Sequence, residues 1–389
     1  MAWLTSWSYR REITIDNTSN SNNLTDYQVK ITLDNTNFDF SKANNDGSDI
    51  RFTDDDGSTL LYHWIEKWDS ANQEAVIWVK VPSILASSTK TIYMYYGNSS
   101  ASDASDGVNT FEFFDDFSGD LSKWYISSGS ASDTIEITVD NKLYLHEEGS
   151  PCKTCQSQDS ISGDFILEYK GKSDVGSNYN LGLGIMDSNQ SDGNGFFPFF
   201  NGNKYFGCFK RTGGSWSNLA NTGSWTENTW YNFKIIREGS GFSFYQDESQ
   251  VGSWSITEIG NSVYIIIPRI WNEETGDAGN LYYDNIRVRK YTDPEPSSSV
   301  GNEETIPYYI SGQVTLNGNP VQGAKVRCIC QDDNSYAGDT TTDTNGNYEI
   351  TDLDPNKKYH VVVEYTDPDT GQKYNAESKW DITPVEGSS

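Results

Sequence analysis

Short segments in which apolar and polar residues alternate constrain the fold of this chain more than any other feature. In the first 112 residues they include Tyr9 to Ile15, Tyr27 to Leu33 and Ala75 to Val81, separated by clusters of Gly, Asn, Asp and Ser. A period of two places every second side chain on one face, which is the pattern of a half-buried β-strand. Long helical repeats are not evident. The sequence therefore predicts an all-β protein.

The length of 389 residues is too great for one ordinary core and fits two or three domains. The 12 Trp, 24 Tyr and 17 Phe supply enough bulky apolar surface for several small sandwich cores. We predict three β-sandwich domains in tandem, at residues 1–112, 113–290 and 308–389. Residues 291–307 are rich in Pro, Ser and acidic residues, which is typical of an exposed linker.

The first predicted domain contains Gly47-Ser48-Asp49-Ile50-Arg51-Phe52 and Ile92-Tyr93-Met94-Tyr95-Tyr96-Gly97-Asn98. With these segments it resembles a family of uncharacterised β domains. That family recurs near the N-termini of large archaeal and bacterial surface proteins and of some viral proteins. The resemblance implies a surface context and carries no established activity.

The second predicted domain opens with Phe113-Phe114-Asp115-Asp116-Phe117 and closes with Leu281-Tyr282-Tyr283-Asp284-Asn285. It resembles a concanavalin-like (laminin G-like) jelly roll. The third contains Val321-Gln322-Gly323-Ala324 and Asp343-Thr344-Asn345-Gly346-Asn347-Tyr348. It resembles a small carboxypeptidase-regulatory-like, transthyretin-like β sandwich, for which we expect a scaffolding role.

The net charge of −28 bears on the partners of the chain. Such a charge repels nucleic-acid phosphates and the anionic cytoplasmic leaflet, which leaves divalent cations and neutral glycans. No apolar run approaches the ~20 residues of a membrane span. The N-terminus also lacks the basic and apolar regions of a signal peptide, so a virus particle is one expected route out of a cell.

Catalytic motifs are missing from the sequence. Its three histidines, His63, His146 and His360, fall one in each predicted domain, which disfavours a nucleophile–histidine–acid arrangement. Glycosidases that resemble the concanavalin-like fold use Glu-x-Asp-x-x-Glu on one strand, and this motif is missing as well. We therefore expect a protein that is not an enzyme.

A calcium site is the metal site that the jelly-roll resemblance implies. In carbohydrate-binding sandwiches with a similar opening and closing, acidic residues of the first and last strands often meet at one ion. Asp115, Asp116 and Asp284 occupy the matching positions, and carboxylate oxygens suit Ca²⁺. The alternative reading, which stays open, is that the first two form a turn at the domain junction and Asp284 caps a bend.

Four tryptophans among Gly, Ser, Thr and Asn are candidates for stacking on sugar rings: Trp216, Trp225, Trp254 and Trp271. For any one of them a role in the core or in anchoring a loop is the stronger reading. We expect at least one of the four to be exposed as a binding platform.

These observations combine in one functional hypothesis. The chain would be a virion surface protein, such as a tail fibre, a tail-associated adhesin or a capsid decoration, that binds host surface glycans or other virion proteins as a homo-oligomer. It would act on the virion surface or outside a cell. One alternative is a secreted or surface-layer adhesin of a cell. The other is a glycoside-active enzyme or its carbohydrate-binding subunit.

Overall fold

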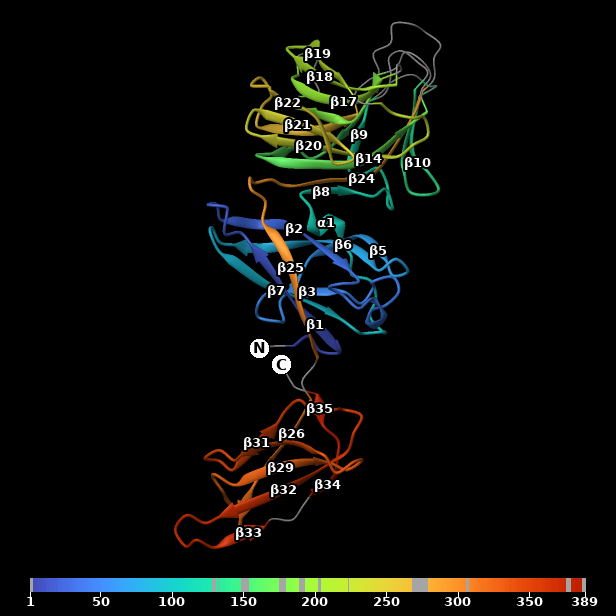
Figure 1. The fold of residues 1–389 in the computed structure, drawn as a ribbon. Coiled ribbons are helices and arrows are strands. Elements are labelled where there is room, and N and C mark those ends of the chain that lie inside the picture. Colours follow the sequence, from blue (N-terminus) through green and yellow to red (C-terminus); the bar gives the residue numbers. More distant parts are fainter. Residues whose placement is uncertain are drawn as a thin grey trace.

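The structure is a computed structural model, and it is built almost entirely of strands (Figure 1). The prediction of an all-β protein of tandem sandwiches is therefore confirmed. Three domains follow one another in Figure 1, with the jelly roll at one end and the third domain at the other. No helix of the described residues is long and apolar enough to cross a membrane. The residues that the structure describes are 3–127, 131, 133–147, 154–174, 180–188, 193–201, 204–222, 224–267, 279–305, 308–375 and 379–386.

The first domain packs a three-stranded sheet against a five-stranded sheet. Their orders are β2–β6–β5 and β25–β1–β7–β3–β4. Alternate residues of facing strands, such as Ile13, Ile31 and Ile92, are completely buried in one core between the sheets. The elements are β1 (Tyr9–Asp16), β2 (Leu24–Asp34), η1 (Phe40–Lys42), β3 (Arg51–Thr53), β4 (Leu60–Leu61), β5 (His63–Asp69), β6 (Glu74–Ile84), β7 (Thr89–Tyr96) and α1 (Gly107–Thr110).

Strand β25 (Ser297–Thr305) corrects the prediction of a linker at 291–307. It pairs antiparallel with β1 along its length, from Tyr9 opposite Thr305 to Asp16 opposite Ser297. Its polar side chains suit the edge of a sheet, and its one large apolar residue, Val300, packs against the core of the first domain. The Pro, Ser and acidic content of residues 291–307 indicated a linker, but strand pairing is made by backbone hydrogen bonds, which do not depend on side-chain type.

The jelly-roll domain is consequently inserted into the first domain, between β7 and β25. It has an eight-stranded sheet, β10–β11–β24–β14–β20–β21–β22 with β8 beside β24. A nine-stranded sheet, β19–β18–β17–β16–β23–β12–β9 with β13 and β15 at its sides, packs against it around one large core.

The two longest strands of the jelly roll, β24 and β14, are neighbours at the centre of the eight-stranded sheet. The strands of the jelly roll are β8 (Phe113–Asp115), β9 (Trp124–Ile126), β10 (Thr134–Ile137), β11 (Leu143–Glu147), β12 (Cys155–Ser157), β13 (Ile161–Ser162), β14 (Phe165–Ser173), β15 (Asn180–Leu181), β16 (Gly184–Met186), β17 (Gly195–Asn201), β18 (Phe206–Thr212), β19 (Ser215–Thr222), β20 (Tyr231–Glu238), β21 (Gly241–Gln246), β22 (Ser249–Ser255), β23 (Ser262–Ile267) and β24 (Gly279–Lys290).

Four aromatic side chains join the first domain to the jelly roll. Trp64 and Trp78 lie on β5 and β6, Phe111 follows α1, and Phe114 lies on β8. All four are at least nine-tenths buried, and the ring centroids of Trp64 and Phe114 are 4.9 Å apart. Burial of this much aromatic surface holds the two domains together as one unit.

Charged side chains surround this aromatic cluster. Arg287 and Arg289 of β24 both bind Glu168 of β14, with Nε to Oε2 distances of 3.0 and 3.3 Å. Arg287 also reaches Glu66 of the first domain at 2.9 Å, and Arg289 pairs with Glu295. Burial alone would raise the pKa of Glu168, but the two guanidinium groups outweigh it and lower that pKa to about 2. Glu168 is therefore charged at neutral pH.

The third domain has its own small core between short sheets. Their orders are β31–β26–β35, β27–β28 and β30–β29–β32–β33, with β34 also paired to β32. The strands are β26 (Tyr308–Gln313), β27 (Thr315–Leu316), β28 (Asn319–Pro320), β29 (Lys325–Cys330), β30 (Tyr336–Thr341), β31 (Asn347–Ile350), β32 (Tyr359–Thr366), β33 (Lys373–Asn375), β34 (Lys379–Ile382) and β35 (Val385–Glu386).

Candidate functional site

Strand β24 carries two different surfaces on the outward face of the eight-stranded sheet. At its C-terminal end Arg287 and Arg289 pack against the first domain. Toward its N-terminal end, where β11 is its neighbour, Tyr282 occupies the same face. Between Tyr282 and Arg287, Asn285 has a φ of 50°. The register of β24 with β14 shifts at the same level, between Glu168 and Lys170 of β14. This irregularity divides the face in two. We call the part around Arg287 and Arg289, which packs against the first domain, the docked half, and the part around Tyr282 the open half.

The open half holds a set of side chains that we call the aromatic row: Tyr144, His146, Lys172, Trp230 and Tyr282. In the sheet Tyr144 is opposite Tyr282, and Tyr282 is opposite Lys172. Tyr144 lies between Leu143 and Leu145, which are buried in the core. Since side chains alternate along a strand, the row points outward.

Distances within the aromatic row show a continuous contact across the sheet. The ring centroids of Tyr144 and Tyr282 are 5.1 Å apart, and those of Tyr144 and His146 are 6.4 Å apart. The Lys172 ammonium lies 4.2 Å from the Tyr282 centroid and 5.4 Å from the Trp230 centroid. Trp230 is 38% exposed, and the other four are half-buried. The row is therefore accessible at the surface.

Asn280 fixes the β11 end of the aromatic row. Its side-chain oxygen accepts a hydrogen bond from the Tyr144 hydroxyl at 2.8 Å and lies 2.7 Å from His146 Nδ1. Its side-chain nitrogen donates to Asp174 Oδ2 at 2.7 Å, and its backbone N–H donates to Asp174 Oδ1 at 3.0 Å. This network orients the two rings before any ligand arrives.

The charges around the aromatic row are of both signs. Lys142 pairs with Asp284 at 3.0 Å, and Lys172 lies against two rings. Partial burial raises the pKa of Tyr144 and of Tyr282, and the Asp174 carboxylate acts in the same direction. Both tyrosines are therefore neutral near pH 7. The row offers aromatic rings, hydroxyls, an imidazole and one ammonium group, all of which can bind a ligand.

The three predicted calcium ligands have partners within the protein. Asp115 is buried, and its carboxylate accepts hydrogen bonds from Trp124 Nε1 at 2.7 Å and from the Phe117 backbone at 3.0 Å. Burial raises the pKa of Asp115, although these bonds lower it in part. Asp116 accepts from the backbone of Ser118 in a turn, and Asp284 pairs with a lysine.

No group of three or more His, Cys, Asp or Glu side chains in the described part of the chain is arranged to hold a metal ion. The calcium hypothesis for Asp115, Asp116 and Asp284 therefore stays a prediction, as does the alternative of a turn at the domain junction.

The predicted tryptophans have different environments. Trp225 is 3% exposed and packs against Phe200 in the core, with ring centroids 5.2 Å apart. Trp254 is half-buried at the edge of the same core and stacks obliquely on Phe196. Trp271 lies outside the described residues.

Trp216 lies on the outward face of the nine-stranded sheet. It is half-buried and packs against a small cluster of Met186, Phe197 and Ile266, while the Arg211 guanidinium lies 5.5 Å from its ring centroid. The three cluster residues are at most 5% exposed. Trp216 therefore covers apolar side chains of this face, whereas the aromatic row lies on the other sheet.

Sequence reasoning missed the aromatic row because it looked for tryptophans in loops. The row lies on strands, apart from Trp230, which immediately precedes β20. The signal was the alternation in Leu143-Tyr144-Leu145-His146, where aromatic residues occupy the outward positions. Sequence alone does not show that β11, β24 and β14 are neighbours, so the residues could not be assembled into one site.

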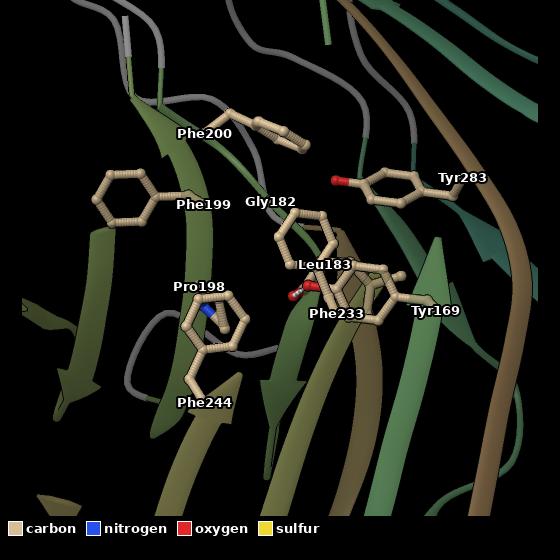
Figure 2. A pocket seen from close by; sticks show the side chains of 9 residues that line it. All are labelled: Tyr169, Gly182, Leu183, Pro198, Phe199, Phe200, Phe233, Phe244 and Tyr283. Carbon is tan, nitrogen blue, oxygen red and sulfur yellow. Dashed lines mark hydrogen bonds between the residues drawn. The ribbon is translucent and has the colours of Figure 1, made fainter. Parts of the chain in front are cut away.

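The interior of the jelly roll contains a small pocket between the two sheets (Figure 2). Figure 2 shows the rings of Tyr169, Phe233 and Phe244 around it, and the Tyr169 hydroxyl donates to the Leu183 carbonyl at 3.0 Å. The pocket has room for about one water molecule. It is a packing defect of the core, too small for an organic ligand.

Comparisons with known families match two parts of the chain. Residues 46–127 match a domain of unknown function (DUF2341), and residues 309–378 match a carboxypeptidase regulatory-like domain. The predicted resemblance of the third domain is therefore confirmed. No curated protein is similar enough to the chain to count as a relative.

Several solved structures are similar to about half of the chain. A pseudo β-1,3-glucanase and immunostimulatory antigen of Mycobacterium tuberculosis is 14% identical, with 47% of this chain and 99% of that chain covered and a TM-score of 0.39. The endo-β-1,3-glucanase of Pyrococcus furiosus is 13% identical, with 47% and 94% covered and a TM-score of 0.38. The carbohydrate-binding module CBM66 of Bacillus subtilis is 18% identical, with 43% and 96% covered and a TM-score of 0.32.

These neighbours bear on the prediction that the chain is not an enzyme. They include proteins named as β-1,3-glucanases as well as a binding module. The prediction is contradicted by this comparison and is withdrawn.

Proposed function

We propose that the jelly-roll domain binds carbohydrate through the aromatic row. The observation that carries the proposal is the outward, continuous contact of Tyr144, Tyr282, Lys172 and Trp230, which crosses β11, β24, β14 and the residue before β20. Aromatic faces match the apolar C–H faces of sugar rings, and the hydroxyl and ammonium groups beside them can bind sugar hydroxyls. The names of the solved neighbours, which include a carbohydrate-binding module, agree with this class of ligand.

The wider proposal concerns where this binding takes place. The chain would be a surface adhesin in which the first and third domains provide attachment and reach while the jelly roll meets host glycans. A virion component, such as a tail fibre or capsid decoration, is our preferred setting, and a secreted or surface-layer adhesin is the alternative. The succession of the three β domains in Figure 1, from the jelly roll at one end to the third domain at the other, supports a role that needs reach.

A glycan array tests the proposal with the full chain and two matched variants. Tyr282→Ala removes the centre of the aromatic row. Tyr336→Ala removes a tyrosine of the third domain that is 64% exposed and far along the chain from the row, so it serves as the control. We expect binding by the unaltered protein and by Tyr336→Ala, and a loss of at least tenfold for Tyr282→Ala. Equal binding by the three proteins, or no binding to any glycan, would contradict the proposal.

The same glycans should be assayed for release of reducing sugar, because several solved neighbours are named glucanases. If the Tyr282→Ala variant still released reducing sugar, the hydrolytic site would lie outside the aromatic row. Binding without release would restrict the function of the jelly roll to recognition of the glycans on the array.

A further inference from the structure

We infer that the aromatic row takes a linear, uncharged glycan that lies across the strands and contacts several sugar units at once. This inference rests on the proposed function and adds the length, the direction and the charge class of the ligand. Its premises are the order of the strands, the chemistry at the two ends of the row and the charges beside it.

The order of the strands sets the direction and the length. The row crosses β11, β24, β14 and the residue before β20, which are successive neighbours in one sheet. Neighbouring strands are about 4.8 Å apart, so three steps span roughly 14 Å. A single pyranose ring is shorter than this platform, whereas a short oligosaccharide matches it. The glycan would therefore run perpendicular to the strands.

The two ends of the aromatic row differ in chemistry. At the β11 end Tyr144 and His146 hydrogen-bond to Asn280, which Asp174 holds in place. At the other end the Trp230 side chain is 38% exposed, and its ring centroid lies 5.4 Å from the Lys172 ammonium. Hydroxyl recognition would therefore be concentrated at the Tyr144 end, and stacking of a further sugar unit at Trp230 would add affinity only for longer chains.

The charges favour a glycan without carboxylate or sulfate groups. The chain carries a net charge of −28, which repels polyanions at a distance. Near the row, Lys142 is already paired with Asp284, the Lys172 ammonium lies close enough to Asp140 to stabilise the charged form of that carboxyl, and the Asp174 carboxylate lies near Tyr282. No surplus of positive charge remains among these residues to attract an acidic polymer.

Calorimetry with oligosaccharides of defined size tests the inference on the full chain. The probes are β-1,3-glucan, β-1,4-glucan and α-1,4-glucan series from one to six units, together with hyaluronan fragments as an anionic comparison. In the series that binds, we expect affinity to rise by at least tenfold from one unit to about three or four and then to level off. Hyaluronan fragments should bind at least tenfold more weakly at equal length.

Two tryptophan variants separate the outcomes. Trp230→Ala should lower the affinity for chains of three or more units by about tenfold while leaving the shortest binding chain almost unchanged. Trp380→Ala, which removes a tryptophan of the third domain that is 63% exposed, should change neither. Length-independent binding that Tyr282→Ala abolishes and Trp230→Ala spares would overturn the inference and leave the proposed function intact. Stronger binding of hyaluronan than of the neutral glucans would overturn the inference of an uncharged ligand. Binding to no series would overturn the further inference, whereas the glycan array decides separately on the proposed function.

Discussion

The outward face of the eight-stranded sheet has a docked half and an open half, and the two are built from the same strands. In the docked half Arg287 and Arg289 are buried against the first domain, and they form an ion network with Glu168, whose side chain is 14% exposed. In the open half Lys172 and Tyr282, a few residues away on the same two strands, contact each other and remain accessible. Positions a few residues apart on one strand therefore either hold the jelly roll to the first domain or remain accessible to a ligand, and contact with the first domain decides which.

The comparison shows that the contribution of a contact between charged or aromatic side chains to the free energy of folding depends on how deeply the contact is buried. A charged group that is removed from water must be paired, and removal of its partner leaves an isolated buried charge. Exposed side chains in contact with one another add little to stability, so they are free to serve a ligand. Substitutions in the docked half should therefore affect folding, and substitutions in the open half should affect binding.

The largest effect is expected for Glu168→Ala in the docked half. The variant leaves Arg287 and Arg289 without their shared carboxylate, and breaking a buried pair in this way costs about 3–5 kcal/mol. Urea unfolding of the first two domains should show the loss. Glu364→Ala, which breaks an exposed pair with Arg327 in the third domain, is the control and should cost no more than about 1 kcal/mol. Equal effects of the two variants would remove the distinction between the halves.

Acid should weaken the docked half first. Burial would raise the pKa of Glu168, yet the two arginines hold it at about 2, below the ordinary value of 4.5. A lowered folded-state pKa contributes stability above the ordinary pKa, and that contribution is lost as the pH falls from about 4.5 toward 2. Thermal unfolding over this range should therefore show a steeper loss for the unaltered protein than for Glu168→Gln. Parallel curves would argue against a charged Glu168.

A smaller effect on folding is expected for Tyr282→Ala in the open half. The side chain is half-buried and lies outside the core, so the free energy of unfolding should change by no more than about 1 kcal/mol. Its effect on glycan affinity, a loss of tenfold or more, should instead be equivalent to at least about 1.4 kcal/mol. Urea unfolding and calorimetry on the same protein samples compare the two. A large loss of stability would place Tyr282 with the docked residues.

Tyr144→Phe should have a weaker effect on binding than Tyr282→Ala. It keeps the ring and removes the hydrogen bond to Asn280, which is worth about 1 kcal/mol. We expect a fall in glycan affinity of a few fold, measured by calorimetry, with the length dependence unchanged. An affinity equal to that of the unaltered protein would show that Asn280 does not orient the ring for binding.

The smallest effect is expected for removal of calcium. Asp284 at the boundary between the two halves is paired with Lys142, and Asp115 accepts hydrogen bonds from the Phe117 backbone and from Trp124 Nε1 of β9. Treatment with EGTA should therefore leave the thermal midpoint of the jelly roll unchanged. A drop of several degrees, reversed by Ca²⁺, would show that an ion holds these carboxylates after all.

Much of the fold could be predicted from the sequence, because alternation of apolar residues reports directly on strands. It located strands such as β1, β2 and β6, and it indicated several sandwiches. The site was harder, since Trp225 has the loop composition of an exposed residue and yet fills the core. Loop composition does not report on burial when a loop folds back over the edge of a sandwich.

The sequence by itself determined that this protein is a set of β sandwiches and that its surface is strongly acidic. Only the tertiary structure decided that residues 297–305 complete the first domain and that Tyr144, Tyr282 and Lys172 stand side by side. The reason is physical. Alternation along one strand is a local property of the chain, whereas the choice of neighbouring strand depends on backbone hydrogen bonds between segments far apart in the sequence.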